Sequence, residues 1–155
     1  MDLTTEENDI KYILVVDDVV DNLRVMSDLL KNKGYEVRCT KNGRAALQAV
    51  LEKTPDLILL DIQMPELDGF EICKRLKQKE QTRNVPVIFL SAADDIESKI
   101  KGFEVGGIDY ITKPFQLEEV LIRVNNQLSL QTAKKEIQAL NQLLQEQFNL
   151  QKLKI

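Results

Sequence analysis

The chain has 155 residues, of which 43% are hydrophobic and 30% are charged, and its formal net charge is −4. This length and composition are typical of one globular domain with its own core, and the negative charge argues against a nucleic-acid-binding surface. The sequence contains no histidine, which excludes Ser-His-Asp and Cys-His catalysis and the usual zinc hydrolases.

Targeting signals are not evident in the sequence. No apolar run approaches the roughly 20 residues that cross a bilayer. The N-terminal stretch MDLTTEENDIK is acidic and lacks the basic and apolar regions of a signal peptide. The two cysteines, Cys39 and Cys73, are too few for a disulfide framework or a zinc site. We therefore expect a cytoplasmic protein with no membrane contact.

The predicted elements alternate between strands and helices. In chain order we predict a strand over 11–16, a helix over 22–33, a strand over 35–40, a helix over 44–53, a strand over 56–60, a helix over 68–79, a strand over 85–91, a helix over 94–105, a strand over 109–112 and a helix from about 117. The runs ILVV and DLILL are typical of strands buried on both faces. This alternation predicts an α/β fold in which helices cover both faces of a parallel sheet.

Polar side chains follow the predicted strands at their carboxyl ends. Asp17 and Asp18 follow the first strand, Asp61 the third, and Lys113 the fifth, whereas Ser91 ends the fourth. In parallel α/β sheets, ligands bind at this edge. The sequence therefore predicts that three carboxylates, a hydroxyl and an amine lie close together.

Clustered carboxylates repel one another, so this edge needs a cation at neutral pH. Mg²⁺ is the fitting cofactor because it takes oxygen ligands from one or two carboxylates, and the EF-hand pattern of a calcium loop is absent. A metal, a lysine and a hydroxyl together could receive a phosphoryl group, and a carboxylate can itself be the acceptor. Asp61 is favoured as acceptor because it stands alone at a strand end, although spacing alone leaves Asp17 and Asp18 possible.

The sequence from about residue 117 onward has neither glycine nor proline and is rich in helix formers. One stripe is expected to close the domain: Leu117, Leu121, Val124 and Leu128. A second stripe has heptad spacing: Leu130, Ala133, Ile137, Leu140 and Leu144. Beyond it, the same register reaches Gln147 and Gln151, so the heptad is imperfect. We predict a parallel homodimer through this helix; the alternative is a helix that frays or folds back on its own domain.

Four motifs in order resemble the receiver domain of two-component response regulators, the CheY-like family. They are Asp17-Asp18, LLDIQMPELDGFE at 59–71, LSA at 90–92 and DYITKPF at 109–115. The resemblance covers about residues 10–128 and implies a flavodoxin-like, doubly wound, five-stranded parallel sheet of strand order 2-1-3-4-5. One departure is Gly106-Gly107, where the family often has Gly-Ala, which suggests a looser loop.

The resemblance also implies a role for each site residue. Asp61 is the phosphoacceptor. The implied metal ligands are the carboxylates of Asp17, Asp18 and Asp61 and the backbone carbonyl of Gln63. The implied phosphoryl-binding and switch residues are Ser91, Lys113 and Tyr110, with a cis bond before Pro114. The donor is a phosphohistidine on a partner histidine kinase or phosphotransfer protein, and the chain itself catalyses only its own phosphotransfer and dephosphorylation.

Several alternatives remain open. The predicted organisation is an N-terminal tail at 1–9, a receiver domain at 10–128 and a helical extension at 129–155, and the chain could be the first domain of a longer regulator with a kinase or cyclase output. It could also be a coiled-coil adaptor with the receiver as scaffold. A flavin or nucleotide site lacks its glycine-rich loop, because VVDDVVD has no glycine. An aspartyl phosphatase would need Asp-x-Asp, but Val19 follows Asp17 by two residues.

Overall fold

The structure is a computed structural model that describes residues 10–153, so the expected tail at 1–9 lies outside the described residues. Its elements alternate as predicted. They are β1 (Tyr12–Val16), α2 (Val20–Asn32), β2 (Glu36–Thr40), α3 (Gly43–Glu52), β3 (Leu57–Asp61), α4 (Gly69–Gln78), β4 (Val87–Ser91), α5 (Ile96–Glu104), β5 (Asp109–Thr112) and α6 (Leu117–Leu153).

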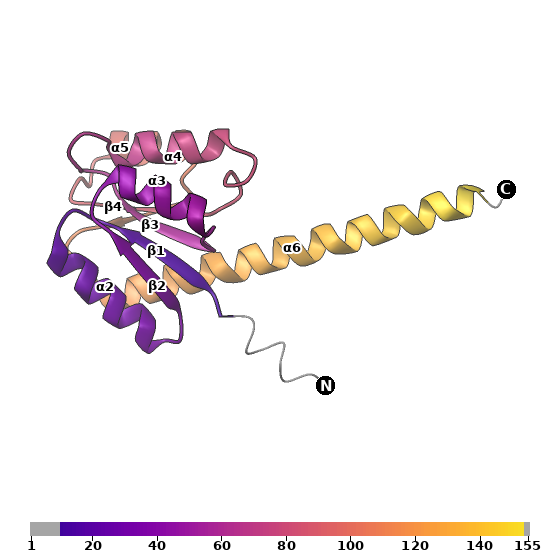
Figure 1. The fold of residues 1–155 in the computed structure, drawn as a ribbon, viewed down its shortest axis with the longest axis horizontal. Coiled ribbons are helices and arrows are strands. Elements are labelled where there is room, and N and C mark those ends of the chain that lie inside the picture. Colours follow the sequence, from indigo (N-terminus) through magenta and orange to yellow (C-terminus); the bar gives the residue numbers. More distant parts are fainter. Residues whose placement is uncertain (1–9, 154–155) are drawn as a thin grey trace.

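The five strands form one parallel sheet in the order β2-β1-β3-β4-β5. The predicted fold class is confirmed. Helices α2 and α6 cover one face, and α3, α4 and α5 lie on the other (Figure 1). The strand register pairs Val16 with both Thr40 and Leu60, and Ser91 with Thr112, so the carboxyl ends of neighbouring strands are level.

Each face of the sheet has its own apolar layer, because successive strand residues point to opposite sides. Ile13 and Val15 of β1 pack with α2 and α6, whereas Leu14 and Val16 pack with α3 and α4. All four side chains are fully buried. The run ILVV therefore serves two layers at once and fixes β1 in the middle of the fold.

The first turn of α6 differs from the expected stripe. Val120, Val124 and Leu128 are the buried residues of this helix, whereas Leu117 is 44% exposed. Leu117 stands at the start of the helix and lines an open groove beside α2, so the core does not cover it. Periodicity identified the buried face but not the point along the helix where burial begins.

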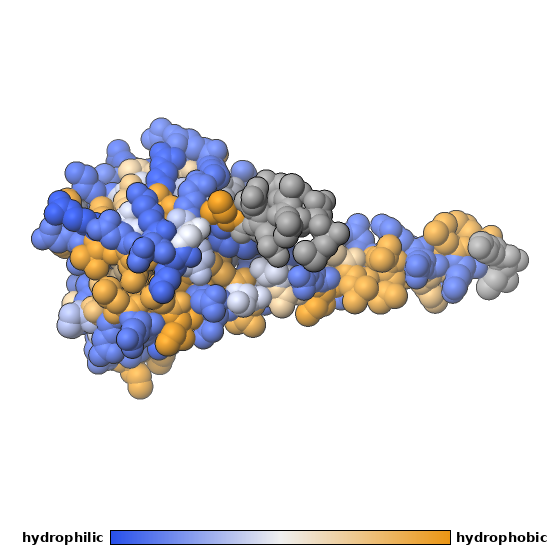
Figure 2. Space-filling model, turned by 90° about the horizontal axis from the view of Figure 1, so that it is seen from below, coloured by the Kyte–Doolittle hydropathy of each residue, from blue (hydrophilic) through white to orange (hydrophobic). Residues whose placement is uncertain are grey.

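Helix α6 continues well beyond the body of the domain (Figure 1). Leu128 is its last buried residue, and every side chain from 133 to 153 is exposed. The helix therefore does not fold back on its own domain. Figure 2 shows apolar side chains along the projecting part, interrupted by hydrophilic ones. Within residues 10–153, no helix combines the length and apolarity that a membrane span requires.

The glycine pair before β5 is tightly packed, contrary to the looser loop that the sequence suggested. A Cβ at Gly107 would lie 2.3 Å from Cε2 of Phe89. Gly106 has a φ of +109°, a conformation that side chains disfavour. The large Phe89 ring occupies the space that an alanine methyl would need.

Candidate functional site: an acidic cluster at the sheet edge

The strand ends carry the predicted acids to one edge of the sheet. Asp61 is the last residue of β3, and Asp17 directly follows β1. The loop after Asp61 turns back against Gly69, where a Cβ would lie 2.4 Å from the Asp61 carbonyl oxygen. The Gly69 amide donates to the carbonyl of Ile62. Gly69 therefore holds the loop after Asp61 in place through close contact with the backbone of Asp61 and Ile62.

Three carboxylates meet at this edge. Asp17, Asp18 and Asp61 each offer an oxygen, and these oxygens lie within 4.8 Å of one another. Asp17 and Asp61 are almost completely buried, at 0% and 2% exposure, whereas Asp18 is exposed. A cluster of oxygen ligands with one exposed member fits Mg²⁺, which usually keeps several waters.

Lys113 is the cation next to the cluster. Its Nζ lies 3.0 Å from Oδ2 of Asp17 and 3.3 Å from Oδ2 of Asp61. The Lys113 amide donates to the Ser91 carbonyl, and the peptide bond between Lys113 and Pro114 is cis. One ammonium thus contacts two of the three carboxylates and leaves the cluster with excess negative charge.

The pKa of Asp61 reflects its burial and the excess negative charge of the cluster. Burial and the neighbouring Asp17 charge raise the pKa of Asp61 from 3.8 to about 7, although Lys113 and the Gln63 amide act in the opposite direction. The Gln63 amide donates to Oδ1 of Asp61 at 3.2 Å. Without a second cation, the Asp61 carboxylate is therefore partly protonated near neutral pH.

Ser91 and Tyr110 meet through the backbone of Ala93. The Ala93 amide donates to Oγ of Ser91 at 3.0 Å, and the Tyr110 hydroxyl donates to the Ala93 carbonyl at 2.8 Å. Ser91 is fully buried, and Tyr110 is only 7% exposed. The Tyr110 ring therefore already occupies an inward position. The polar side chains that the sequence placed at the strand ends, Asp17, Asp18, Asp61, Ser91 and Lys113, therefore lie on this edge, with Tyr110 beside it.

Asp17 also has a structural role, because it holds the start of α2. Its Oδ1 accepts from the Val19 amide at 2.9 Å, and its Oδ2 accepts from Nδ2 of Asn22 at 3.2 Å. The Asp17 amide donates to the Thr40 carbonyl. Sequence reasoning missed Asn22 and Thr40, because a contact with Asp17 from a helix turn or from a backbone carbonyl leaves no pattern in the sequence.

Residues 13–125 match the family described as the response regulator receiver domain. The chain belongs to this family. It is also 40% identical, over 135 residues, to the regulatory protein AtoC of Escherichia coli, in a match that covers 87% of this chain and 29% of AtoC.

Two further proteins are similar to this chain over the receiver domain. The DNA-binding dual master transcriptional regulator RpaA of Synechocystis is 41% identical over 112 residues, which are 72% of this chain and 46% of RpaA. The crystal structure of a putative response regulator from Chloroflexus aurantiacus is 40% identical with a TM-score of 0.72, and it covers 77% of this chain and 98% of that one. The chain spans less than half the length of either curated relative.

The receiver assignment fits the site geometry. Receiver domains bind Mg²⁺ in an acidic pocket, and the three aspartates form such a pocket here. Receiver domains also interact with histidine kinases or phosphotransfer proteins. The family match therefore does not favour the flavin-binding and phosphatase alternatives.

Proposed function

We propose that this receiver domain accepts a phosphoryl group on Asp61 from the phosphohistidine of a histidine kinase or phosphotransfer protein. One observation carries the proposal: a buried carboxylate at a strand end lies beside two other carboxylates and within 3.3 Å of Lys113. Burying a carboxylate without enough positive charge nearby is costly. The cluster is therefore suited to binding a phosphoryl group together with a metal ion.

Phosphoryl transfer to Asp61 is a single displacement at phosphorus. An oxygen of the Asp61 carboxylate forms a bond to phosphorus while the bond from phosphorus to the donor nitrogen breaks. The nitrogen leaves with the electron pair, and the product is an acyl phosphate. The reacting form is the carboxylate, so a proton on Asp61 must leave before attack.

The cluster also supplies the ligands for Mg²⁺. The carboxylates of Asp17, Asp18 and Asp61 and the backbone carbonyl of Gln63 would hold it, with Asp18 at the solvent side. Bound Mg²⁺ would offset the charge of the phosphoryl oxygens during transfer. Asp17 is restrained by its hydrogen bonds to Val19 and Asn22, so it acts as the fixed side of the site.

Three side chains respond to the phosphoryl group: Lys113, Ser91 and Tyr110. Lys113 binds a phosphoryl oxygen by loosening its contact with Asp17. Ser91 turns its hydroxyl toward the phosphate and weakens its bond with the Ala93 amide. Tyr110 is bonded to the Ala93 carbonyl, so a shift of Ala93 reaches the surface formed by α5, β5 and α6.

The acceptor role is tested by incubating the full chain with acetyl phosphate and Mg²⁺ and measuring intact mass. We expect one added phosphoryl group, absent from Asp61→Asn and retained by Asp28→Asn, which removes an exposed aspartate on α2. An undiminished adduct on Asp61→Asn refutes the assignment. Loss of the adduct from both variants would indicate a general effect of charge.

We also propose that α6 mediates a parallel homodimer, with the receiver unit at 10–128 and the extension at 129–155. Large apolar side chains of the extension are about half exposed: Leu130 at 53%, Ile137 at 58%, Leu140 at 56% and Leu144 at 54%. Their heptad spacing fits a second copy of the same helix. Parallel pairing places Gln147 opposite its own copy, where two amides can hydrogen-bond across the seam.

A further inference from the structure

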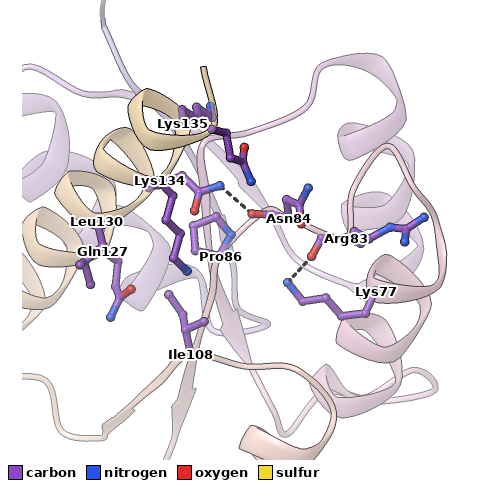
Figure 3. Close-up of a pocket in the computed structure, with 11 residues that line it drawn as sticks. Lys77, Arg83, Asn84, Pro86, Ile108, Gln127, Leu130, Lys134 and Lys135 are labelled. Carbon is purple, nitrogen blue, oxygen red and sulfur yellow. Dashed lines mark hydrogen bonds between the residues drawn. The ribbon is translucent and has the colours of Figure 1, made fainter. Parts of the chain in front are cut away.

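A pocket lies at the junction between the domain body and the projecting part of α6, and the acidic site does not use it. Its volume is about 230 Å³. The walls come from α4, from the loop before β4, from Ile108 before β5, and from α6 (Figure 3). Asn84 and Pro86 precede β4, whereas Ser91 ends it. The pocket is therefore at the opposite edge of the sheet from Asp61.

The charge of this pocket is one-sided. Four basic residues line it, Lys77, Arg83, Lys134 and Lys135, and no aspartate or glutamate does. The Arg83 side chain points away from α6 (Figure 3), so the lysines are the cations available to a ligand at this junction. Within the described part of the chain, none of these four forms an ion pair with a carboxylate. In a protein of net charge −4, lysines without a carboxylate partner around one cavity favour an anionic ligand.

Lys77 is held in place by the fold. Its Nζ donates to the carbonyls of Arg83 at 3.0 Å and Val85 at 2.7 Å, and its stem crosses Gly106, where a Cβ would lie 2.8 Å from Cγ of Lys77. Burial lowers the pKa of Lys77, and its two hydrogen-bond partners are neutral carbonyls. A nearby anion would supply the countercharge that this ammonium lacks.

The remaining lining residues limit the kind of anion. Pro86, Ile108 and Leu130 give the pocket an apolar wall, and Gln127 and Gln138 add amide groups. Lys134 points from α6 into the pocket (Figure 3). Lysine ammonium groups are suited to phosphate oxygens. The small volume is unsuited to a nucleic acid duplex, which needs an extended surface.

We propose that this pocket binds a small molecule carrying two or more phosphate groups. The ligand bridges the body, through Lys77, to the extension, through Lys134 and Lys135. The junction already has one such link, because Nε2 of Gln131 donates to the Asn84 carbonyl at 2.8 Å. A bound polyphosphate would reinforce this link and fix the direction in which α6 leaves the domain.

The test uses inorganic tripolyphosphate as the probe and isothermal titration calorimetry of the full chain in buffer freed of divalent metals. We expect one tripolyphosphate per chain. Lys134→Gln with Lys135→Gln should weaken binding about tenfold or more, the size expected for lost charge-assisted contacts. Glutamine is also a good helix former, so α6 is retained. Lys74→Gln with Lys152→Gln removes the same charge outside the pocket and should leave the affinity within about twofold.

Four further results decide the proposal. Asp61→Asn should bind the probe like the wild type, which separates this pocket from the phosphoacceptor site. Citrate should bind more weakly than tripolyphosphate, and equal binding would overturn the phosphate class. Equal weakening in the two double variants would mean diffuse electrostatic attraction, and absence of binding at millimolar probe would likewise overturn the proposal.

Discussion

The ammonium of Lys113 lies closer to Asp17 than to the acceptor, at 3.0 Å from Oδ2 of Asp17. Both side chains are largely withdrawn from water, at 19% and 1% exposure. Lys113 therefore divides its charge between a restrained carboxylate and the reactive one. A phosphoryl group on Asp61 would compete with Asp17 for this lysine, which gives the site two alternative arrangements of one ion pair.

The raised pKa of Asp61 makes stability depend on pH. The pKa is about 7 in the folded chain and 3.8 for an ordinary aspartate, so between these values the folded state holds a proton that the unfolded state has lost. The contribution of Asp61 to the free energy of unfolding therefore falls as the pH rises from about 4 to 7 and is level above that. Urea unfolding without Mg²⁺ should show this fall in the wild type relative to Asp61→Asn.

The control is Asp28→Asn, which should follow the wild type across this range because Asp28 is exposed. At pH 8, Asp61→Asn should be the more stable protein, since a neutral amide removes the repulsion from Asp17. Parallel curves for the wild type and Asp61→Asn would contradict the raised pKa.

Asp18 is expected to bind metal without supporting the fold. It is exposed, whereas Asp17 is buried and hydrogen-bonded. Asp18→Ala should weaken Mg²⁺ binding about tenfold or more, since a direct carboxylate ligand is lost. The melting temperature without Mg²⁺ should stay level or rise, because carboxylate repulsion is relieved. A marked fall in melting temperature would instead identify Asp18 as a structural cap.

The lifetime of the acyl phosphate should depend on Ala93. This residue is half-buried beside Ser91, and its backbone bonds both Ser91 and Tyr110. Hydrolysis needs a water in line with the bond from Asp61 to phosphorus, and a small side chain leaves that approach open. Ala93→Tyr should lengthen the half-life measured by loss of radioactive phosphate. Ala92→Tyr, at an exposed neighbour, is the matched control, and equal decay in both variants would exclude Ala93 from the path.

Gly107 and Phe89 should behave as a coupled pair. Gly107→Ala adds a methyl that would lie 2.3 Å from the Phe89 ring, so we expect a loss of about 1–3 kcal/mol in the free energy of unfolding. Phe89→Leu makes room for the methyl, and the double variant should be less destabilised than the sum of the two single changes. Simple additivity in urea unfolding would show that the ring does not set the requirement for glycine.

The sequence contained enough information for the sheet and the acidic edge but not for every contact. In the apolar runs that end in Asp17, Asp61 and Ser91, the apolar residues predict the strand and the polar residue marks its carboxyl end. The cluster could therefore be predicted from the topology of a parallel sheet. The exposure of Leu117 depends on tertiary packing at the first turn of α6, which periodicity does not encode. The basic pocket joins Lys77 to Lys134, and no local pattern relates side chains so distant in the chain.

The exposed stripe of α6 gives the last prediction. A lone helix leaves Ile137, Leu140 and Leu144 in water, and burying each is worth about 1.5–3 kcal/mol. Leu140→Asp with Leu144→Asp should therefore convert a dimer into a monomer that still accepts phosphate at Asp61. Gln142→Asp with Gln145→Asp adds the same charge at positions outside the stripe and should remain dimeric. Sedimentation velocity at tens of micromolar distinguishes these states. A monomeric wild type, phosphorylated or not, would refute the dimer while leaving the acceptor role of Asp61 intact.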